Sequence, residues 1–152
     1  MVDLPSIAPR LAALAEADPE REVCGFVVAG SGGGQAVFPV RNVAEATGEG
    51  YEIDPAPHLA LARRLRAEGG RIVAVYHSHV DGPARLSATD LEHALDDGLP
   101  LLPGVDQVVI GIESGKAVEV RAFHFSGAGF EPLEVWTAPT APASRRVAPA
   151  AP

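Results

Sequence analysis

Apolar and polar positions follow helix-like and strand-like periods over most of the chain. Apolar residues three or four positions apart predict amphipathic helices over residues 7–17, 58–68 and 87–97. Short apolar runs rich in β-branched residues predict strands. These predicted strands cover residues 23–29, 35–42, 51–53, 71–77, 107–112, 118–125 and 130–136.

Turn residues mark the ends of several of these elements. Ser6 is placed to cap the first helix, and Gly69-Gly70 is placed to end the second. The glycine-rich residues 30–34 are followed by neither a helix nor a lysine, so a hairpin is favoured over a phosphate-binding loop. Because a hairpin joins antiparallel strands, we expect an α/β (α+β) fold with a mixed sheet between helices.

The predicted domain covers residues 1–136. A chain of 152 residues is expected to form one domain with its own hydrophobic core. Residues 137–152 contain four prolines and six alanines without any periodicity. This composition is typical of a disordered tail.

The net charge of −8 argues against non-specific binding to nucleic acid or to an anionic membrane surface. No run of about 18 apolar residues is present to span a bilayer. The first residues lack a basic segment followed by an apolar run, as in a secretory signal. Cys24 is the single cysteine, so no intramolecular disulfide can form. We therefore expect a cytoplasmic protein.

The main candidate for chemistry is Tyr76-His77-Ser78-His79, at the end of a predicted buried strand. Side chains two positions apart on a strand point to the same side, with Cα atoms about 6.5 Å apart. Two imidazoles so placed can converge on one metal ion. The alternative is a pair of polar residues where the strand leaves the core.

Asp90 is the candidate third ligand. It lies three residues after Ser87 at a predicted helix start, which by itself favours a capping box. The two roles are compatible, because a helix N-terminus stabilises the ionised carboxylate that a metal requires. Three protein ligands and one open position are typical of a catalytic zinc site. A hydrolase also needs a base, and spacing alone does not choose among Glu16, Glu20 and Glu22.

These residues resemble the signature of the JAMM (MPN+) metalloproteases. That signature is Glu, then His-Ser/Thr-His, seven residues, Ser, two residues and Asp. The chain matches it at Glu22, His77, Ser78, His79, Ser87 and Asp90. Weaker similarities are the Glu-x-Cys-Gly opening and Tyr51 followed by Asp54-Pro55. The resemblance extends from about Pro19 to Phe125.

The resemblance implies a role for each matching residue. His77, His79 and Asp90 would hold Zn²⁺, and Glu22 would be the general base and proton shuttle. Ser87 would donate a hydrogen bond to the oxyanion, and Ser78 would pack or bond behind the ligands. The family fold is a cytidine-deaminase-like sandwich of a mixed sheet between helices. Val80 departs from the proline found in many members, but carries no ligand atom.

The resemblance also implies a substrate class. Only a helix and a short loop separate Asp90 from the strand at Gln107, so the chain resembles minimal prokaryotic members without ubiquitin-gripping insertions. Such members cut an isopeptide or peptide bond after the Gly-Gly tail of a ubiquitin-like or sulfur-carrier protein. The alternative is a non-catalytic MPN-type scaffold that binds partners, although scaffold members usually lack a ligand. A deaminase is disfavoured, because its zinc site uses a Cys-x-x-Cys pair.

The remaining candidates have simpler explanations. Cys24, on a predicted apolar strand, is expected to be a buried apolar filler rather than a nucleophile. His58 and His93 lie on predicted helices, where surface or hydrogen-bonded positions are expected rather than metal binding. His124 lies between Phe123 and Phe125 and is expected to face out of the sheet.

Overall fold

The computed structural model describes residues 1–44 and 50–139 of the chain. Its main element is a six-stranded sheet with the strand order β2-β1-β3-β6-β7-β8. Only β3 and β6 pair in parallel, and the other neighbours are antiparallel, which confirms a mixed sheet. The strands are β1 (Cys24–Ala29), β2 (Gln35–Val40), β3 (Arg71–His79), β6 (Asp106–Glu113), β7 (Lys116–Phe125) and β8 (Phe130–Thr137).

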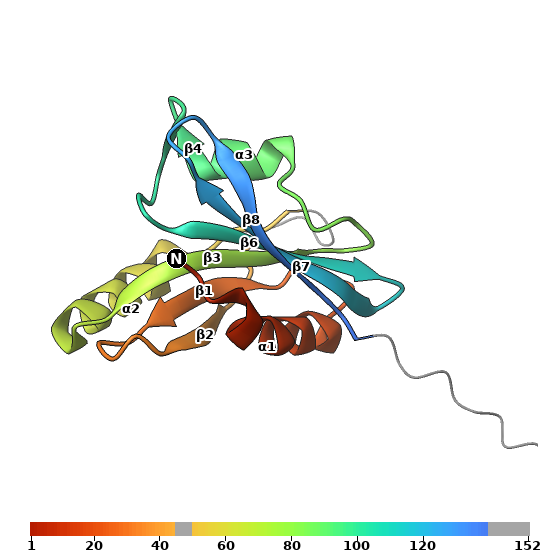
Figure 1. The fold of residues 1–152 in the computed structure, drawn as a ribbon, viewed down its shortest axis with the longest axis horizontal. Coiled ribbons are helices and arrows are strands. Elements are labelled where there is room, and N and C mark those ends of the chain that lie inside the picture. Colours follow the sequence, from red (N-terminus) through yellow and green to blue (C-terminus); the bar gives the residue numbers. More distant parts are fainter. Residues whose placement is uncertain (45–49, 140–152) are drawn as a thin grey trace, which may run out of the picture.

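Helices lie on both sides of this sheet, as the sequence predicts. The helices are α1 (Leu4–Ala17), α2 (Pro55–Glu68) and α3 (Ala88–Ala94). The apolar face of α1 packs against one sheet face, with Leu4 and Leu11 fully buried. Leu61 and Leu65 of α2 pack on the opposite face. Figure 1 shows α1 and α3 on opposite sides of the sheet, so the fold is an α/β sandwich.

The helix bounds correct three predictions. Ser6 does not cap α1, because the helix begins at Leu4 after Asp3, with a proline in its first turn. Helix α2 begins three residues earlier than predicted, because the Asp54 carboxylate accepts a hydrogen bond from the Ala56 N–H. Helix α3 ends at Ala94 rather than at residue 97, because the chain then enters a two-stranded hairpin of β4 (Leu95–Asp96) and β5 (Leu99–Pro100).

The structure also tests the short strand predicted at residues 51–53 and the first residues of the predicted tail. Residues 51–53 form no strand, although Ile53 makes an isolated bridge to Asn42. Strand β8 includes Thr137, one residue beyond the predicted domain boundary. Residues 140–152 of the predicted tail lie outside the described residues. Among the described helices, none has the length and apolar character needed to cross a membrane.

The sheet topology decides where the candidate residues meet. Strand β1 pairs with β3 so that Cys24 lies opposite His77. Glu22 lies two residues before the start of β1, and β3 ends at His79. Gly25 permits this close packing, because a Cβ there would clash with the Phe38 carbonyl oxygen and lie 2.7 Å from the Tyr76 hydroxyl. The glycine of the Glu-x-Cys-Gly opening therefore has a steric role.

Candidate metal centre

Three side chains converge at the end of β3. His77 Nε2 and His79 Nε2 lie 3.0 Å apart, and Asp90 Oδ2 lies 3.1 Å and 3.0 Å from them. Two ligands about 2.0 Å from a tetrahedral metal lie about 3.3 Å apart, close to these distances. Among the described residues this is the one group of three or more potential ligands close enough to share an ion. The donor set therefore fits a metal ion.

Packing holds His77 in place. Its side chain is fully buried, and Tyr51 stacks on it with ring centroids 4.3 Å apart and planes inclined by 20°. His77 Nδ1 has no hydrogen-bond partner in the described part of the chain. Stacking and strand packing, rather than a hydrogen bond to Nδ1, therefore orient this imidazole toward Asp90.

A hydrogen bond orients His79. Its Nδ1 lies 2.9 Å from the Pro83 carbonyl oxygen, which can only accept, so Nδ1 carries the proton. The neutral ring therefore presents the lone pair of Nε2 to the centre, as a metal ligand requires. Residues 80–86 fold close over β6. A Cβ at Gly111 would lie 3.0 Å from the Ala84 nitrogen and 3.2 Å from the Gly82 carbonyl oxygen.

Asp90 caps α3, and its position is also compatible with the ligand role that the sequence suggests. Its Oδ2 accepts a hydrogen bond from the Ser87 N–H at 2.9 Å, while Ser87 Oγ accepts one from the Asp90 N–H at 3.1 Å. This pair forms a complete capping box at the start of α3. The same Oδ2 faces both imidazoles. Helix capping therefore fixes the carboxylate at the centre.

The three groups shift one another's pKa values in different directions. Burial would raise the pKa of Asp90, but hydrogen bonds from His77 and His79 outweigh it and hold the pKa well below its usual range. Burial lowers the pKa of His77 despite the hydrogen bond to Asp90. Burial also opposes protonation of His79, but its bonds to Asp90 and to the Pro83 carbonyl raise its pKa above 6.5. The centre thus pairs an ionised carboxylate with one readily protonated imidazole.

We expect metal binding to weaken as the pH falls through the raised pKa of His79. A proton on Nε2 competes directly with the metal, so the affinity is fully developed above that pKa and declines below it. One displaced proton corresponds to about a tenfold loss of affinity per pH unit at the acidic end. Calorimetric titration between about pH 8 and about pH 5, in buffers of different ionisation enthalpy, measures both affinity and proton release. A pH-independent affinity would contradict this expectation.

Glu22 lies beside this centre. It is 8% exposed, and its charge contributes to the raised pKa of His79. Ser78 holds the backbone on both sides of it, because Ser78 Oγ accepts from the Val23 N–H at 2.8 Å and donates to the Arg21 carbonyl at 3.5 Å. Ser78 is fully buried behind the ligands, as expected. The topology thus brings Glu22 to the ligands across about 55 residues of sequence.

The structure gives the other two candidate bases, Glu16 and Glu20, and the cysteine different surroundings. Glu20 is exposed, whereas Glu16 Oε1 accepts a hydrogen bond from the Ala117 N–H at 3.0 Å. Cys24 is buried as expected, and burial, with a contribution from the charge of Glu22, raises the pKa of its thiol to about 12. It is therefore a poor nucleophile at neutral pH.

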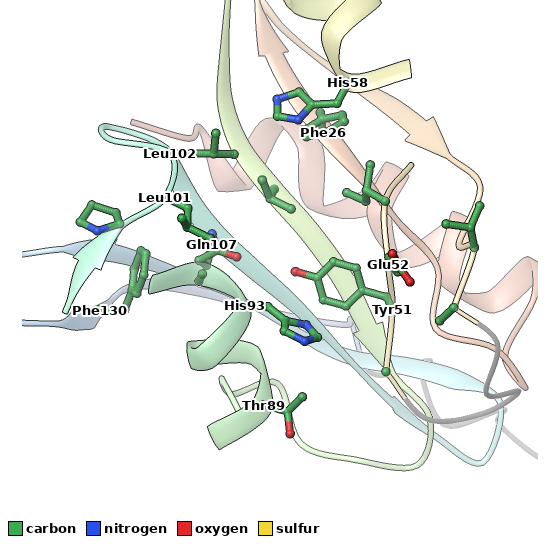
Figure 2. A pocket seen from close by; sticks show the side chains of 17 residues that line it. Phe26, Tyr51, Glu52, His58, Thr89, His93, Leu101, Leu102, Gln107 and Phe130 are labelled. Carbon is green, nitrogen blue, oxygen red and sulfur yellow. The ribbon is translucent and has the colours of Figure 1, made fainter. Parts of the chain in front are cut away.

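A cleft of about 1150 Å³ opens beside the centre. Its lining includes Tyr51, which stacks on His77, and Thr89, which precedes Asp90 in the sequence. His58 and His93 also line it, so these two imidazoles are cleft residues (Figure 2). In Figure 2 the rings of Tyr51 and His93 come from different elements and point into the same space. The sequence signalled Tyr51 only as a weak similarity and did not predict the cleft.

His124 is partly exposed, as expected, but it is not isolated. Its Nδ1 lies 2.6 Å from Oδ1 of the fully buried Asp106, whose Oδ2 accepts a hydrogen bond from the Val2 N–H at 2.8 Å. This network connects the N-terminus to the sheet, and none of its residues belongs to the His77, His79 and Asp90 group.

The fold and the site define an α/β sandwich domain with a His-His-Asp group positioned for metal binding. The sequence profile described as prokaryotic homologs of the JAB domain matches residues 5–126. The chain belongs to this family, which confirms the resemblance to JAMM proteins.

Two curated relatives are similar to part of the chain. Desampylase of Haloferax volcanii is 39% identical over 83 residues, which cover 53% of this chain and 59% of the relative. A probable TtuB-protein conjugate cleaving protease of Thermus thermophilus is 37% identical over 60 residues, which cover 40% of each. The matched segments therefore span less than two thirds of either relative's length.

Solved structures show the same fold. A solution structure of a protein from Desulfitobacterium hafniense has a TM-score of 0.66 and 25% identity, and covers 85% of this chain and 86% of its own. A solution structure of a Salinibacter ruber protein has a TM-score of 0.57 and 27% identity, and covers 86% of both chains.

Proposed function

We propose that this protein is a zinc-dependent peptidase or isopeptidase that cleaves after the C-terminal Gly-Gly tail of a ubiquitin-like or sulfur-carrier protein. The observation that carries this proposal is the convergence of His77, His79 and Asp90 beside the buried Glu22. The names of the two curated relatives, desampylase and conjugate cleaving protease, support the same class of substrate.

The donor set favours zinc among the common metals. Two imidazole nitrogens and one carboxylate oxygen form a three-residue set typical of catalytic zinc, whereas magnesium and calcium prefer oxygen ligands throughout. When bound, zinc would act as a Lewis acid toward water and the scissile carbonyl. His77, His79 and Asp90 would hold it and leave one position open.

The residues around the ligands supply the proton transfer and charge stabilisation that hydrolysis needs. Glu22 is buried, and its charge acts on His79. It would take a proton from the attacking water and deliver it to the leaving amine. Ser87 Oγ accepts its capping bond from Asp90, which leaves the hydroxyl hydrogen to donate to the developing oxyanion. Ser87 is exposed, so a substrate can reach it.

The cleft suits an extended tail with apolar side chains. Phe26, Val75 and Phe130 contribute to its lining, and Leu101 at its edge is 55% exposed. An apolar surface left open beside a polar centre is typical of a partner-binding site. A Gly-Gly end, which lacks side chains, could pass Tyr51 and reach the metal. Peptide binding in the cleft would thus place the bond after the second glycine at the centre.

The test is cleavage of carrier-protein fusions that carry a short peptide after Gly-Gly. We expect the zinc-loaded protein to cut after the second glycine, and a chelator to abolish the cut until zinc is restored. Replacing the second glycine by valine should block cleavage, because the proposed substrate class ends in Gly-Gly. Mass spectrometry locates the cut. Cleavage that survives complete removal of metal would refute the proposal.

The alternative of a non-catalytic scaffold has no comparable support. The structure brings the three potential ligands together, and no observation requires them in a purely binding protein. Tight binding of a carrier protein without any cleavage, in the presence of zinc, would favour the scaffold.

A further inference from the structure

The side chain of Asn42, just after β2, uses its full hydrogen-bonding capacity. Its Nδ2 donates to the carbonyl oxygens of Glu22 at 3.0 Å and Gly50 at 3.2 Å. Its Oδ1 accepts from the N–H groups of Ala44 at 2.9 Å and Glu52 at 3.0 Å. A carboxamide has two donor hydrogens and two acceptor lone pairs, so all four are satisfied by backbone groups.

These four partners belong to two functional parts of the molecule. One is the backbone of Glu22, the proposed base. The other three lie in the segments at residues 43–44 and 50–53, which we call the cleft wall because they line the cleft. The Val43 N–H also donates to the Glu52 carbonyl at 2.9 Å, so a backbone hydrogen bond joins the two segments of the wall.

The cleft wall reaches the metal ligands through Tyr51. Tyr51 lies between Gly50 and Glu52, the two wall residues that bond to Asn42 on that side, and its ring stacks on His77. A shift of the wall would therefore move both the cleft lining and the ring that packs on a ligand. Because Asn42 bonds to Glu22 as well, it links the base, the cleft and the metal centre.

We propose that Asn42 is a positioning residue that sets Glu22 relative to the substrate cleft. It acts through the backbone of Glu22 and of the wall, not through contact with the reacting atoms. The proposal deepens the proposed function and rests on it. It follows that a single carboxamide positions both the base and the substrate cleft. Its donors bond to Glu22 and to the wall, whereas its acceptors bond to the wall alone.

Two substitutions separate these effects. Asn42→Asp keeps an acceptor for Ala44 and Glu52 but replaces the donor, so a carboxylate oxygen faces the Glu22 and Gly50 carbonyls. We expect kcat on the Gly-Gly fusion to fall about 10-fold to 100-fold, with bound zinc within about twofold of wild type. KM should rise less than in Asn42→Ala, because the two acceptor bonds to the wall remain although the bond to the Gly50 carbonyl is lost. Asn42→Ala removes all four bonds, so kcat should fall and KM should also rise.

Gln35→Glu is the matched control. Gln35 Nε2 donates to the Met1 carbonyl at 2.9 Å and its Oε1 accepts from the Asp3 N–H at 2.7 Å, so the same amide-to-acid change breaks the same kind of bond away from the cleft. We expect kcat and KM to stay within about twofold of wild type. An equal loss of kcat in this control would overturn the proposal, because it would indicate general destabilisation.

A pH profile distinguishes lost positioning from added charge. If the added negative charge rather than lost positioning lowered kcat, the kcat of Asn42→Asp would recover at higher pH. Recovery to wild-type kcat, or wild-type kcat in Asn42→Ala, would overturn the positioning role. All variants are compared with wild-type cleavage, so failure of the wild-type protein to cleave any fusion would refute the proposed function itself.

Discussion

Glu22→Gln is expected to lower kcat on a Gly-Gly fusion by about 10³-fold while zinc binding is unchanged. Glutamine has nearly the shape of glutamate, so the backbone contacts of residue 22 with Asn42 and the neighbouring bonds to Ser78 are retained. The amide cannot accept a proton from water or return one to the leaving amine. The loss should therefore appear in kcat, with KM close to wild type.

The matched control is Glu20→Gln. Glu20 lies two residues earlier and is exposed, so the same change of charge there should leave kcat within about twofold of wild type. Zinc content is measured by mass spectrometry on the same samples. Wild-type turnover in Glu22→Gln would remove Glu22 from the mechanism, and a loss of zinc in that variant would make it a ligand or ligand support instead.

His77→Ala is expected to abolish both zinc binding and cleavage. The substitution removes one of three converging ligand atoms and also the partner on which Tyr51 stacks. Loss of an outer-shell partner of a metal ligand typically costs about 10–100-fold in metal affinity, so loss of a ligand should cost more. We expect zinc content near zero after dialysis, and cleavage at the level of the chelated wild-type protein.

His93→Ala is the control for this experiment. His93 is an exposed imidazole on α3 that lines the cleft but does not belong to the converging group. Its removal should leave zinc content at wild-type level, although peptide binding can change. Circular dichroism tests whether His77→Ala remains folded, which is needed because truncation of a fully buried side chain leaves a destabilising cavity. Stoichiometric zinc in folded His77→Ala would contradict the assigned ligand set.

Local patterns in the sequence were sufficient for most of the fold. The apolar runs predicted strands over β1, β3, β6 and β7 within a few residues, because buried strands need consecutive apolar side chains. The helix bounds were less predictable. Pro5 and Pro55 are compatible with a first helical turn, and only the observed caps show that α1 and α2 begin there. The two-stranded β4–β5 hairpin was missed because strands of two residues have no period.

The candidate ligands were predicted because their spacing is a local property of two elements. Residues two apart on a strand share a face, which places His77 and His79 together, and a capping box places Asp90 at a helix start. The choice of Glu22 over Glu16 and Glu20 needed the family resemblance, since spacing alone left three carboxylates open. The register of β1 against β3, with Cys24 opposite His77, places Glu22 beside the three converging side chains, and its role as the base stays a prediction.

The sequence by itself determined the strands of the main sheet, its mixed character and the residue types of a candidate metal centre, because each depends on periods and spacings within one or two elements. Tertiary structure alone decided the stacking of Tyr51 on His77, the Pro83 carbonyl that orients His79 and the four bonds of Asn42. These contacts join segments through loops and strand pairing. Their geometry depends on how the whole chain packs, which no local pattern encodes.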